Sequence, residues 1–420
     1  METSAALPGG PHTDSKNSVI KHNNHNDINF ANNNNIVSAG LVDKSNNDLI
    51  SHLLIQEMRV RQNGVFPMDE AISDALPDGF EFVSVVYFGY SAWTITGKLI
   101  ARSSNVGSVF FVKIAYGETG RVMLLGEFES SKIIYELMPD FIPQPFGYGK
   151  YKKADTPTYF YMSQFVDLDV TTAQDPSMFC ERLAELHLGS QRLADKFGFH
   201  VTTCDGDRAH IVEWESDWAV FYRKMFLHTL SLDIKRNGSW PEYELAGHQV
   251  AWKVIPLLLE GLTWNGNPIK PSLIHGDLWE GNTGISNETN LPMMFDAGSY
   301  FAHNEMELGH WVCEFSATFG AQAYMDQYVE SFGMAEPAEE FDDRIRLYSL
   351  KGGINYSAGH PGSRLRKSAY NSMCYLCEKY APIDGIDAYD ETIDPIKTGA
   401  KIEQLGDDEP GINIHISSGV

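Results

Sequence analysis

The order of apolar and polar positions predicts a β-rich segment followed by a helical one. Three stretches rich in β-branched and aromatic residues, at 80–90, 93–101 and 108–115, are separated by a turn at Gly89 and by the polar segment 102–107. Stretches of this kind with polar turns between them are typical of antiparallel strands. We therefore expect a meander of three strands here.

The period of the apolar positions then changes to that of helices. A helix is expected at 126–137, where Phe128, Ile133, Ile134 and Leu137 fall on or near one face. A proline-rich connection leads to an apolar strand at 159–162. After it, the periodic and Leu- or aromatic-rich segments predict helices at 179–188, 214–230 and 249–259. The pattern predicts an α+β fold with a small antiparallel lobe and a larger helical lobe.

The two ends of the chain differ from the middle. Residues 1–47 are rich in Asn, Ser, Gly and His and have no sustained apolar period, so we expect a disordered arm. A short amphipathic helix is expected at 49–60. The acidic tail from 383 to 420 shows no clear period, and we expect it to be loosely ordered. This organisation predicts an N-terminal lobe at 48–165 and a C-terminal lobe at 166–382.

Charge and composition limit the kinds of partner that the chain is expected to bind. The chain has 420 residues and a formal net charge of -24, which would repel a phosphate backbone, so we expect no nucleic-acid partner. No apolar run approaches the roughly 20 residues that a membrane-spanning helix needs. Five cysteines in so long a chain favour reduced thiols, and Cys374 and Cys377 are expected as a buried helical pair rather than a zinc or redox site. With no secretory or transit signal recognised, a cytoplasmic location is expected.

One short segment predicts the chemistry. His275, Asp277, Leu278 and Asn282 follow the frame H-x-D-L-x-x-x-N, in which Asn stands five positions after Asp. This is the spacing of the kinase catalytic loop, in which the Asp accepts the proton of the acceptor hydroxyl and the Asn holds magnesium on the phosphates. A chance match to three polar positions is the alternative. The frame favours a magnesium-dependent phosphotransferase that uses ATP.

A second carboxylate follows the catalytic frame. Asp296 comes directly after the apolar strand 292–295, and the residues between 284 and 291 are typical of a hairpin turn. This places a carboxylate at a strand end that faces the catalytic loop, where the second metal ligand of a kinase lies. An Asp that merely caps a turn is the alternative. Together with Asn282, we expect Asp296 to bind Mg²⁺.

The β-rich lobe carries a further pair of charged residues. Lys113 ends an apolar strand, and Glu127 follows it by fourteen positions in the next expected helix. In kinases such a Lys positions the α- and β-phosphates and the Glu holds the Lys through an ion pair. Glu129 competes with Glu127 for this role. The turn at 88–93 contains one glycine, so backbone amides assisted by Ser91 or Thr94 would have to cover the phosphates.

Together these motifs resemble the fructosamine and ketosamine 3-kinases, a family related to the aminoglycoside and choline kinases within the protein-kinase-like superfamily. The segment 275–282 is similar to that family's H-G-D-L-W-x-G-N, and Phe295-Asp296 with 303–308 is similar to its F-D-x-x-S-x-x-x-H-x-E-x-E-L. Further matches lie at 183–187 and 197–203 and at four aromatic residues, Trp214, Trp218, Phe221 and Tyr222. The resemblance extends over about 78–380.

The resemblance implies roles for individual residues. It implies a base at Asp277, metal ligands at Asn282 and Asp296, a nucleotide clamp from Lys113 and Glu127, and an acceptor pocket that includes Trp279. Core packing is the alternative for Trp279. His275 is expected to brace the loop, and Glu305 and Glu307 to support a hydrogen-bond network. Met162, Ser163 and Phe165 would lie at the connection between the lobes, where backbone groups contact adenine; Ser163 stands where the family often has an acidic residue.

The function implied is a kinase that uses ATP to phosphorylate the 3-hydroxyl of a ketosamine. The acceptor would be a glycated protein or a small-molecule ketosamine such as a ribulosamine, and the phosphate would promote loss of the sugar, which is a deglycation activity. A related small-molecule kinase acting on another hydroxylated amine is the second hypothesis. A pseudokinase scaffold is the third, favoured by the glycine-poor turn and opposed by Lys113, Asp277, Asn282 and Asp296.

Overall fold

A computed structural model describes residues 65–104 and 106–402 of the chain. All of them belong to one compact unit, Lys44–Val420, and the other unit, Met1–Asp43, lies outside the described residues. The expected arm at 1–47, the expected helix at 49–60 and the tail beyond 402 therefore lie outside the described residues as well. No helix in the described ranges is long and apolar enough to cross a membrane.

The N-terminal lobe is built on a sheet of five strands, in the order β1-β2-β3-β5-β4. Every neighbouring pair is antiparallel, so the expected meander is confirmed. The expectation of a proline-rich connection before residue 159 is wrong for β4. Pro145 opens this edge strand, where a missing amide hydrogen breaks no hydrogen bond of the sheet. The elements are α2 (Glu70–Asp74), β1 (Glu81–Tyr90), β2 (Ile95–Ser103), β3 (Val106–Tyr116), β4 (Pro145–Lys150) and β5 (Thr158–Gln164).

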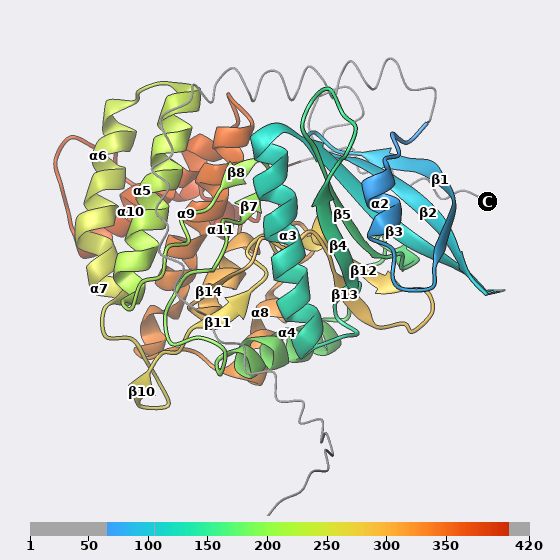
Figure 1. Cartoon of the computed structure of the whole chain (residues 1–420). Coiled ribbons are helices and arrows are strands. Elements are labelled where there is room, and N and C mark those ends of the chain that lie inside the picture. Colours follow the sequence, from blue (N-terminus) through green and yellow to red (C-terminus); the bar gives the residue numbers. More distant parts are fainter. Residues whose placement is uncertain (1–64, 105, 403–420) are drawn as a thin grey trace, which may run out of the picture. The chain divides into compact units, whose positions relative to one another are not determined.

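The helix α3 (Gly117–Leu137) packs against β3, β4 and β5, as Figure 1 shows. It begins nine residues before the expected start at 126, because two glycines in its first turn hide the helical period from a pattern reading. Gly126 allows a close approach in the middle of the helix. A Cβ at this position would lie 2.8 Å from the carbonyl oxygen of Thr202 in the following lobe. The glycine therefore allows α3, which carries Glu127, to lie close to the C-terminal lobe.

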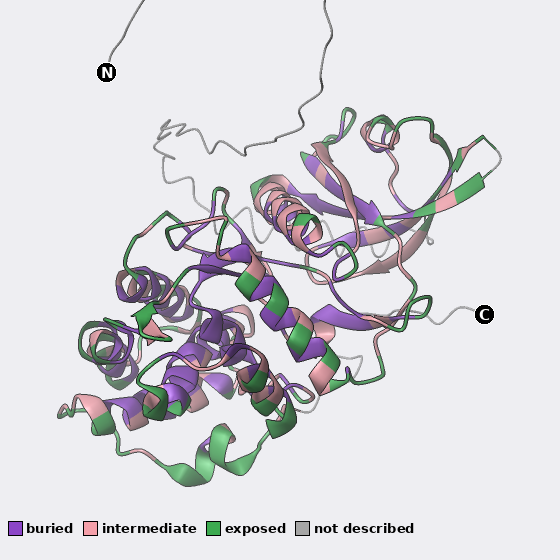
Figure 2. Cartoon of the chain, turned by 90° about the horizontal axis from the view of Figure 1, so that it is seen from below, coloured by how far each residue is buried: buried purple, intermediate pink, exposed green. Residues whose placement is uncertain are grey.

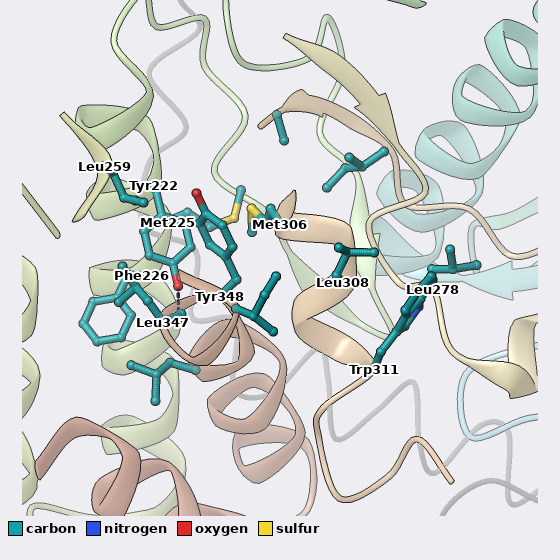
Figure 3. Packing of buried hydrophobic residues seen from close by; sticks show 14 of the residues in the cluster. Tyr222, Met225, Phe226, Leu259, Leu278, Met306, Leu308, Trp311, Leu347 and Tyr348 are labelled. Carbon is teal, nitrogen blue, oxygen red and sulfur yellow. Dashed lines mark hydrogen bonds between the residues drawn. The ribbon is translucent and has the colours of Figure 1, made fainter. Parts of the chain in front are cut away.

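The C-terminal lobe is mainly helical and holds the larger hydrophobic core. Figure 2 shows buried residues on the inner faces of its helices. Tyr222, Trp311 and Tyr348 are fully buried, and Figure 3 shows Tyr222 donating a hydrogen bond to the carbonyl oxygen of Leu347. The helices are α4 (Pro176–Ser190), α5 (Trp218–Asn237), α6 (Pro241–Gln249), α7 (Ile255–Leu259), α8 (Gln322–Phe332), α9 (Phe341–Gly359), α10 (Leu365–Tyr380) and α11 (Pro395–Thr398).

Two expected helices have different bounds in the structure. The segment 249–259 is not one α-helix, because a π-helical turn (Val250–Val254) separates α6 from α7. Pro256 lacks an amide hydrogen and would clash in a continuous α-helix, and the π turn accommodates it. α5 begins at Trp218 rather than at 214, since the side chain of Asp217 caps it by accepting from the amide of Val220 at 2.8 Å.

Short strands in the C-terminal lobe carry the loops between them. β11 pairs with β14, and β12 pairs with both β13 and β6, all antiparallel. The expected hairpin turn within 284–291 lies between β12 and β13. These strands are β6 (Leu168–Asp169), β7 (Cys204–Asp205), β8 (Arg208–Ala209), β9 (Thr263–Trp264), β10 (Asn267–Pro268), β11 (Ser272–Ile274), β12 (Thr283–Ser286), β13 (Pro292–Met294) and β14 (Tyr300–Ala302).

The tail from 383 to 402 folds back on the C-terminal lobe, so the expectation of loose order is wrong for this part. Asp394 is fully buried and accepts a hydrogen bond from Arg346 of α9 at 2.7 Å. Further along, the amide of Ile402 donates to the carbonyl oxygen of Glu314 at 2.9 Å. The sequence did not predict this packing, because the tail forms hydrogen bonds through polar groups and has no apolar period. Cys374 and Cys377 are both buried on α10, as expected.

Candidate functional site

Buried polar groups hold the loop between β11 and β12 in place through hydrogen bonds. The carboxylate of Glu307, on the 3₁₀ helix Asn304–His310, accepts from the amide of Gly276 at 3.1 Å and also from the amide of His275. The Nε2 of His275 donates to the carbonyl oxygen of Phe295 at 2.9 Å. His275 therefore braces the loop, and Glu307 supports it through hydrogen bonds, in the roles expected for both residues.

The loop also requires a glycine at position 276. Gly276 has φ +86°, and a Cβ there would lie 2.3 Å from the carbonyl oxygen of Gly298. A side chain would be strained and would collide with backbone, so only glycine fits. Leu278, two positions later, is fully buried and points into the core of Figure 3. Asp277 therefore lies between two residues, Gly276 and Leu278, whose positions are fixed by their contacts.

Asp277 and Asn282 lie in direct contact. The Nδ2 of Asn282 donates to the main-chain oxygen of Asp277 at 2.8 Å and to its Oδ2 at 3.1 Å. Removal from bulk water and the nearby Asp205 raise the pKa of Asp277 to about 8, against the opposing charges of Lys351 and Arg208. Because the amide nitrogen of Asn282 is engaged, its amide oxygen is the atom suited to a cation.

Lys113 bonds two carboxylates from different lobes. Its Nζ lies 2.9 and 3.0 Å from the carboxylate oxygens of Glu127 and 2.6 Å from the Oδ1 of Asp296. Burial alone would lower the pKa of Lys113, but Asp296 and Glu127 outweigh it and raise the pKa. Burial raises the pKa of Glu127 to about 7, although Lys113 opposes this. Glu129, the rival partner, instead bonds Lys132 and His200.

Asp296 reaches this position through an unusual backbone conformation. It has φ +60°, one of the few left-handed non-glycine residues in the described chain. Such a conformation costs of order 1–3 kcal/mol and persists where the surroundings hold it. Here the amide of Ser299 donates to the Oγ of Ser130 on α3 at 3.0 Å, which ties the segment after Asp296 to the helix that carries Glu127.

The turn between β1 and β2 is organised around Ser91. The Oγ of Ser91 accepts from the amide of Trp93 at 3.2 Å and from the amide of Thr94 at 3.1 Å. These two amides are thus engaged within the turn by Ser91, whereas the expectation was that backbone amides here, assisted by Ser91 or Thr94, cover the phosphates. The turn still lines the cavity described below, so a role for Ser91 in nucleotide binding stays a prediction.

The three residues expected at the lobe connection do not line the cavity of the catalytic residues. Met162 and Ser163 are buried in β5, where Met162 belongs to the core of the N-terminal lobe. The ring of Phe165 packs on that of Phe88 at 5.7 Å, and its amide donates to the carbonyl oxygen of Val109. Their contact with adenine, expected mainly through backbone groups, stays a prediction.

The predicted residues of both lobes otherwise meet around one cavity. Those that line it are Ser91, Lys113, Glu127, Asp277, Trp279, Asn282 and Asp296. Trp279 is half-buried and packs edge-on against Phe315, with ring centroids 6.2 Å apart. Gly281 leaves room for its ring, since a Cβ there would lie 2.4 Å from the indole. The indole therefore forms a wall of the cavity rather than part of the core.

Several residues of the cavity could not be recognised from the sequence. They come from the hairpin of β7 and β8, from the segment around Phe315 and from α9, and include Asp205, Arg208, Phe315, Tyr356 and His360. Arg208 lies over the ring of Trp93, with its Cζ 5.7 Å from the centroid. No motif flags these positions, because each belongs to a segment that meets the catalytic loop only in the folded chain.

The chain that carries this site is similar to a known protein family. The profile of the family described as fructosamine kinase matches residues 94–373. A rice protein named protein-ribulosamine 3-kinase, chloroplastic (Oryza sativa subsp. japonica), is 32% identical over 252 residues, which cover 59% of this chain and 67% of that protein. The ketosamine-3-kinase of Mus musculus is 27% identical over 315 residues, which cover 69% of this chain and 94% of the mouse protein.

Solved structures show the same fold. A crystal structure from Thermobifida fusca, of a protein named as a candidate fructosamine-3-kinase, matches with a TM-score of 0.57 at 20% identity; the match covers 75% of this chain and all of that one. A similarly named protein from Haemophilus somnus matches with a TM-score of 0.56 at 18% identity, covering 73% of this chain and 96% of that one. Both support the two-lobed, protein-kinase-like fold.

Proposed function

Because the chain belongs to the fructosamine kinase family, we propose that it transfers the γ-phosphoryl group of ATP to the 3-hydroxyl of ketosamines. The relatives named as ribulosamine and ketosamine kinases support this acceptor class. One structural observation carries the proposal. Lys113, Asp296 and Asp277, the groups needed for phosphates, metal and acceptor, line the same cavity.

The chain's own residues supply the proton chemistry. Asp277 accepts the proton of the acceptor hydroxyl while that oxygen forms a bond to the γ-phosphorus. The bond between this phosphorus and the β–γ bridging oxygen breaks, and ADP leaves with the electron pair. Asn282 donates to Asp277 and keeps the carboxylate oriented. Lys113, held by Glu127, neutralises phosphate charge.

The donor set suits Mg²⁺. Asn282 offers an amide oxygen while its nitrogen is engaged, and Asp296 offers a carboxylate with a 43% exposed side chain. Mg²⁺ prefers such hard oxygen ligands, together with substrate phosphates and water. When bound, the ion would supply charge that neutralises the β- and γ-phosphates. We propose Asn282 and Asp296 as the residues that hold it.

We propose where the acceptor binds from the position of Trp279, and which acceptor is preferred from the substrates of the family. An indole can stack on a sugar-derived chain, and Trp279 forms one wall of the cavity. We expect a ribulosamine to be a better acceptor than a fructosamine, because a rigid indole wall disfavours an extra hydroxymethyl group. The 3-phosphate would then promote loss of the sugar from the amine, a deglycation.

The test is an acceptor panel with purified full-length chain. Lysine-linked ribulosamine and fructosamine, an aminoglycoside and choline are each offered with Mg²⁺ and ATP, and ADP formation and the phosphorylated product are measured. Turnover of the ketosamines with the 3-phosphate as product is expected. Turnover of only the aminoglycoside or choline would favour the second kinase hypothesis. ATP binding with no turnover of any acceptor would favour a scaffold.

A further inference from the structure

A buried polar cluster lies beside Asp277 and has no role in the transfer described above. The Nζ of Lys351, on α9, lies 2.8 Å from the Oδ2 of Asp205 and 3.3 Å from the carbonyl oxygen of Gly276. The Nδ1 of His310 lies 3.8 Å from the Oδ1 of Asp277. Lys351 is 2% exposed and Asp205 is 8% exposed, yet Asp205 still lines the cavity.

The cluster has the donors of a metal site but already holds a cation. Ligand atoms of Asp205, Asp277 and His310 all lie within 4.8 Å of one another. The ammonium of Lys351 bonds one of these carboxylates directly, and a metal ion would have to displace it or share it at the cost of repulsion. The ammonium group of Lys351 therefore takes the place that a metal ion would need. Asp205 itself lines the cavity.

Asp205 is the charged carboxylate beside Asp277. Asp205 pairs with Lys351 at 2.8 Å. Arg208 pairs with Asp207 at 2.8 Å and also lies 3.9 Å from the Oδ1 of Asp205. Within the described residues no lysine or arginine forms an ion pair with Asp277. Burial lowers the pKa of His310 to about 4, so this ring is neutral near pH 7. Although burial opposes the shift, Lys351 and Arg208 hold the pKa of Asp205 well below its usual value. An ionised carboxylate therefore lines the acceptor side of the cavity, and it favours a cationic acceptor.

The spacing of the two carboxylates fits a ketosamine. Its secondary amine is protonated near neutral pH, and four bonds of about 1.5 Å separate the nitrogen from the 3-oxygen, so the two atoms lie roughly 3–5 Å apart. Oxygen atoms of Asp205 and Asp277 lie within 4.8 Å of each other. A 3-hydroxyl bonded to Asp277 would therefore bring the ammonium group within reach of Asp205.

We propose that Asp205 is the specificity-determining residue that binds the charged secondary amine of the acceptor, and that Lys351 is a positioning residue that holds Asp205 beside the catalytic loop. This inference rests on the proposed function, since it assigns the part of the site that distinguishes a ketosamine from a plain sugar. A charge-assisted hydrogen bond is the interaction that would carry the discrimination.

The experiment compares a charged acceptor with a neutral one. Kinetic constants are measured for a ketosamine and for its N-acetyl derivative, which keeps the sugar chain but carries no charge on nitrogen. In the wild type we expect a lower KM for the charged acceptor. In Asp205→Asn we expect KM for the charged acceptor to rise roughly 10- to 100-fold with kcat changed less than about threefold, and KM for the neutral acceptor to stay within about twofold.

Two further variants separate recognition from folding. Asp205→Asn leaves Lys351 without its partner, so the double variant with Lys351→Met removes both charges and restores a neutral pair. If Asp205 acts only through this ion pair, the double variant recovers both the melting temperature and the KM, which would overturn the proposal. Asp207→Asn is the matched control in the same hairpin, outside the cavity lining, and should keep the preference for the charged acceptor.

The outcomes distinguish this inference from the proposed function. If the wild type phosphorylates both acceptors with equal KM, or if Asp205→Asn keeps the wild-type preference, the inference is wrong and the kinase activity stands. If the wild type phosphorylates neither acceptor while ATP and Mg²⁺ are present, the proposed function fails and this inference falls with it. A preference lost only in the variants that lack the Asp205 charge supports it.

Discussion

Lys113 Nζ lies 2.6 Å from Asp296 Oδ1, although 183 residues separate the two in sequence. This contact joins the sheet of the N-terminal lobe to the segment after β13, and Glu127 completes it on the other side of the ammonium group. We propose that the three residues hold in place, before any substrate binds, the charges that a nucleotide requires. Preorganisation of this kind removes a cost from the reaction step.

Replacing Lys113 by Met should lower kcat/KM for ATP by roughly 10²–10³-fold, because a preorganised cation at the phosphates is lost. Glu127 and Asp296 would also repel each other. Lys132→Met on the same helix is the control, since Lys132 is 42% exposed and bonds Glu129 at the surface. Steady-state kinetics with ATP are measured for both variants. An equal loss of kcat/KM in the two would show that Lys113 does not bind the phosphates.

Asp277→Asn should keep nucleotide affinity within a few-fold of wild type and remove most phosphate transfer. In the proposed mechanism the carboxylate orients and deprotonates the acceptor, and a general base contributes typically about 10²–10⁴-fold. Nucleotide titration and single-turnover transfer measure the two quantities separately. A variant that retains more than about a tenth of the wild-type kcat would refute the role of this residue.

Asn282→Ala and Asp296→Ala should both shift the magnesium dependence of activity to higher concentration. The effect of Asp296→Ala should be larger because Mg²⁺ prefers an anionic oxygen ligand. Activity is measured against total Mg²⁺ at fixed ATP, and melting temperature is measured in parallel to detect loss of folding. Unchanged titration curves for both variants would contradict the metal site.

Gly276→Ala should lower the free energy of unfolding by more than its positive φ alone explains. Gly276 and Gly266 have similar φ values, +86° and +73°, but a Cβ at 276 meets the carbonyl oxygen of Gly298 at 2.3 Å, whereas one at 266 meets nothing within 4 Å. The left-handed conformation costs an alanine roughly 1–2 kcal/mol at either site. Gly276→Ala should add a loss of activity because the catalytic loop must move. If the two variants behave alike in denaturation and kinetics, the close approach has no consequence.

Acidification should destabilise the fold through His303. The side chain is 1% exposed, and burial lowers its pKa to about 4, although Glu305 opposes the shift. The unfolded chain protonates this group near pH 6.5 while the folded chain does not, so unfolding takes up a proton between these values. The free energy of unfolding should fall as the pH drops from about 6.5 to 4, by at most ~3 kcal/mol from this group.

Denaturant unfolding of wild type and His303→Gln at several pH values in this window tests the effect. The variant should lose stability at pH 7, because its bond with Tyr348 changes, and should show a shallower decline on acidification. His248→Gln, at an exposed position, is the control and should follow the wild-type curve. A variant with the wild-type slope would assign the pH dependence to other buried groups.

The sequence was most informative where structure and chemistry are local. The first three strands of the sheet follow from stretches rich in β-branched and aromatic residues with polar turns between them. Asp277 and Asn282 lie within one loop, so their spacing alone predicts their contact. Lys113 could be assigned because it follows the apolar run 110–112 within a strand, and Asp296 because it follows the apolar strand 292–295. Pro145 was the exception, since a proline typical of a loop here opens an edge strand.

The acceptor side could not be predicted in the same way. Asp205 and Lys351 are 146 residues apart, and neither belongs to a periodic or motif-bearing segment that predicts the other. Their meeting depends on how α9 packs against the catalytic loop, which is decided by the whole core of the lobe. The same holds for Asp394, whose partner lies 48 residues away in sequence.

The buried pair of Arg346 and Asp394 also bears on the order of events during synthesis. Arg346 lies inside the lobe with its guanidinium 2.7 Å from Asp394, and a buried charge without its partner is costly. Domains generally fold as units while the chain emerges from the ribosome. The C-terminal lobe therefore cannot reach its native core when α9 has been made, and has to wait until residue 394 is available. A pause in translation before that point would expose an incompletely neutralised core to the cell's quality-control machinery.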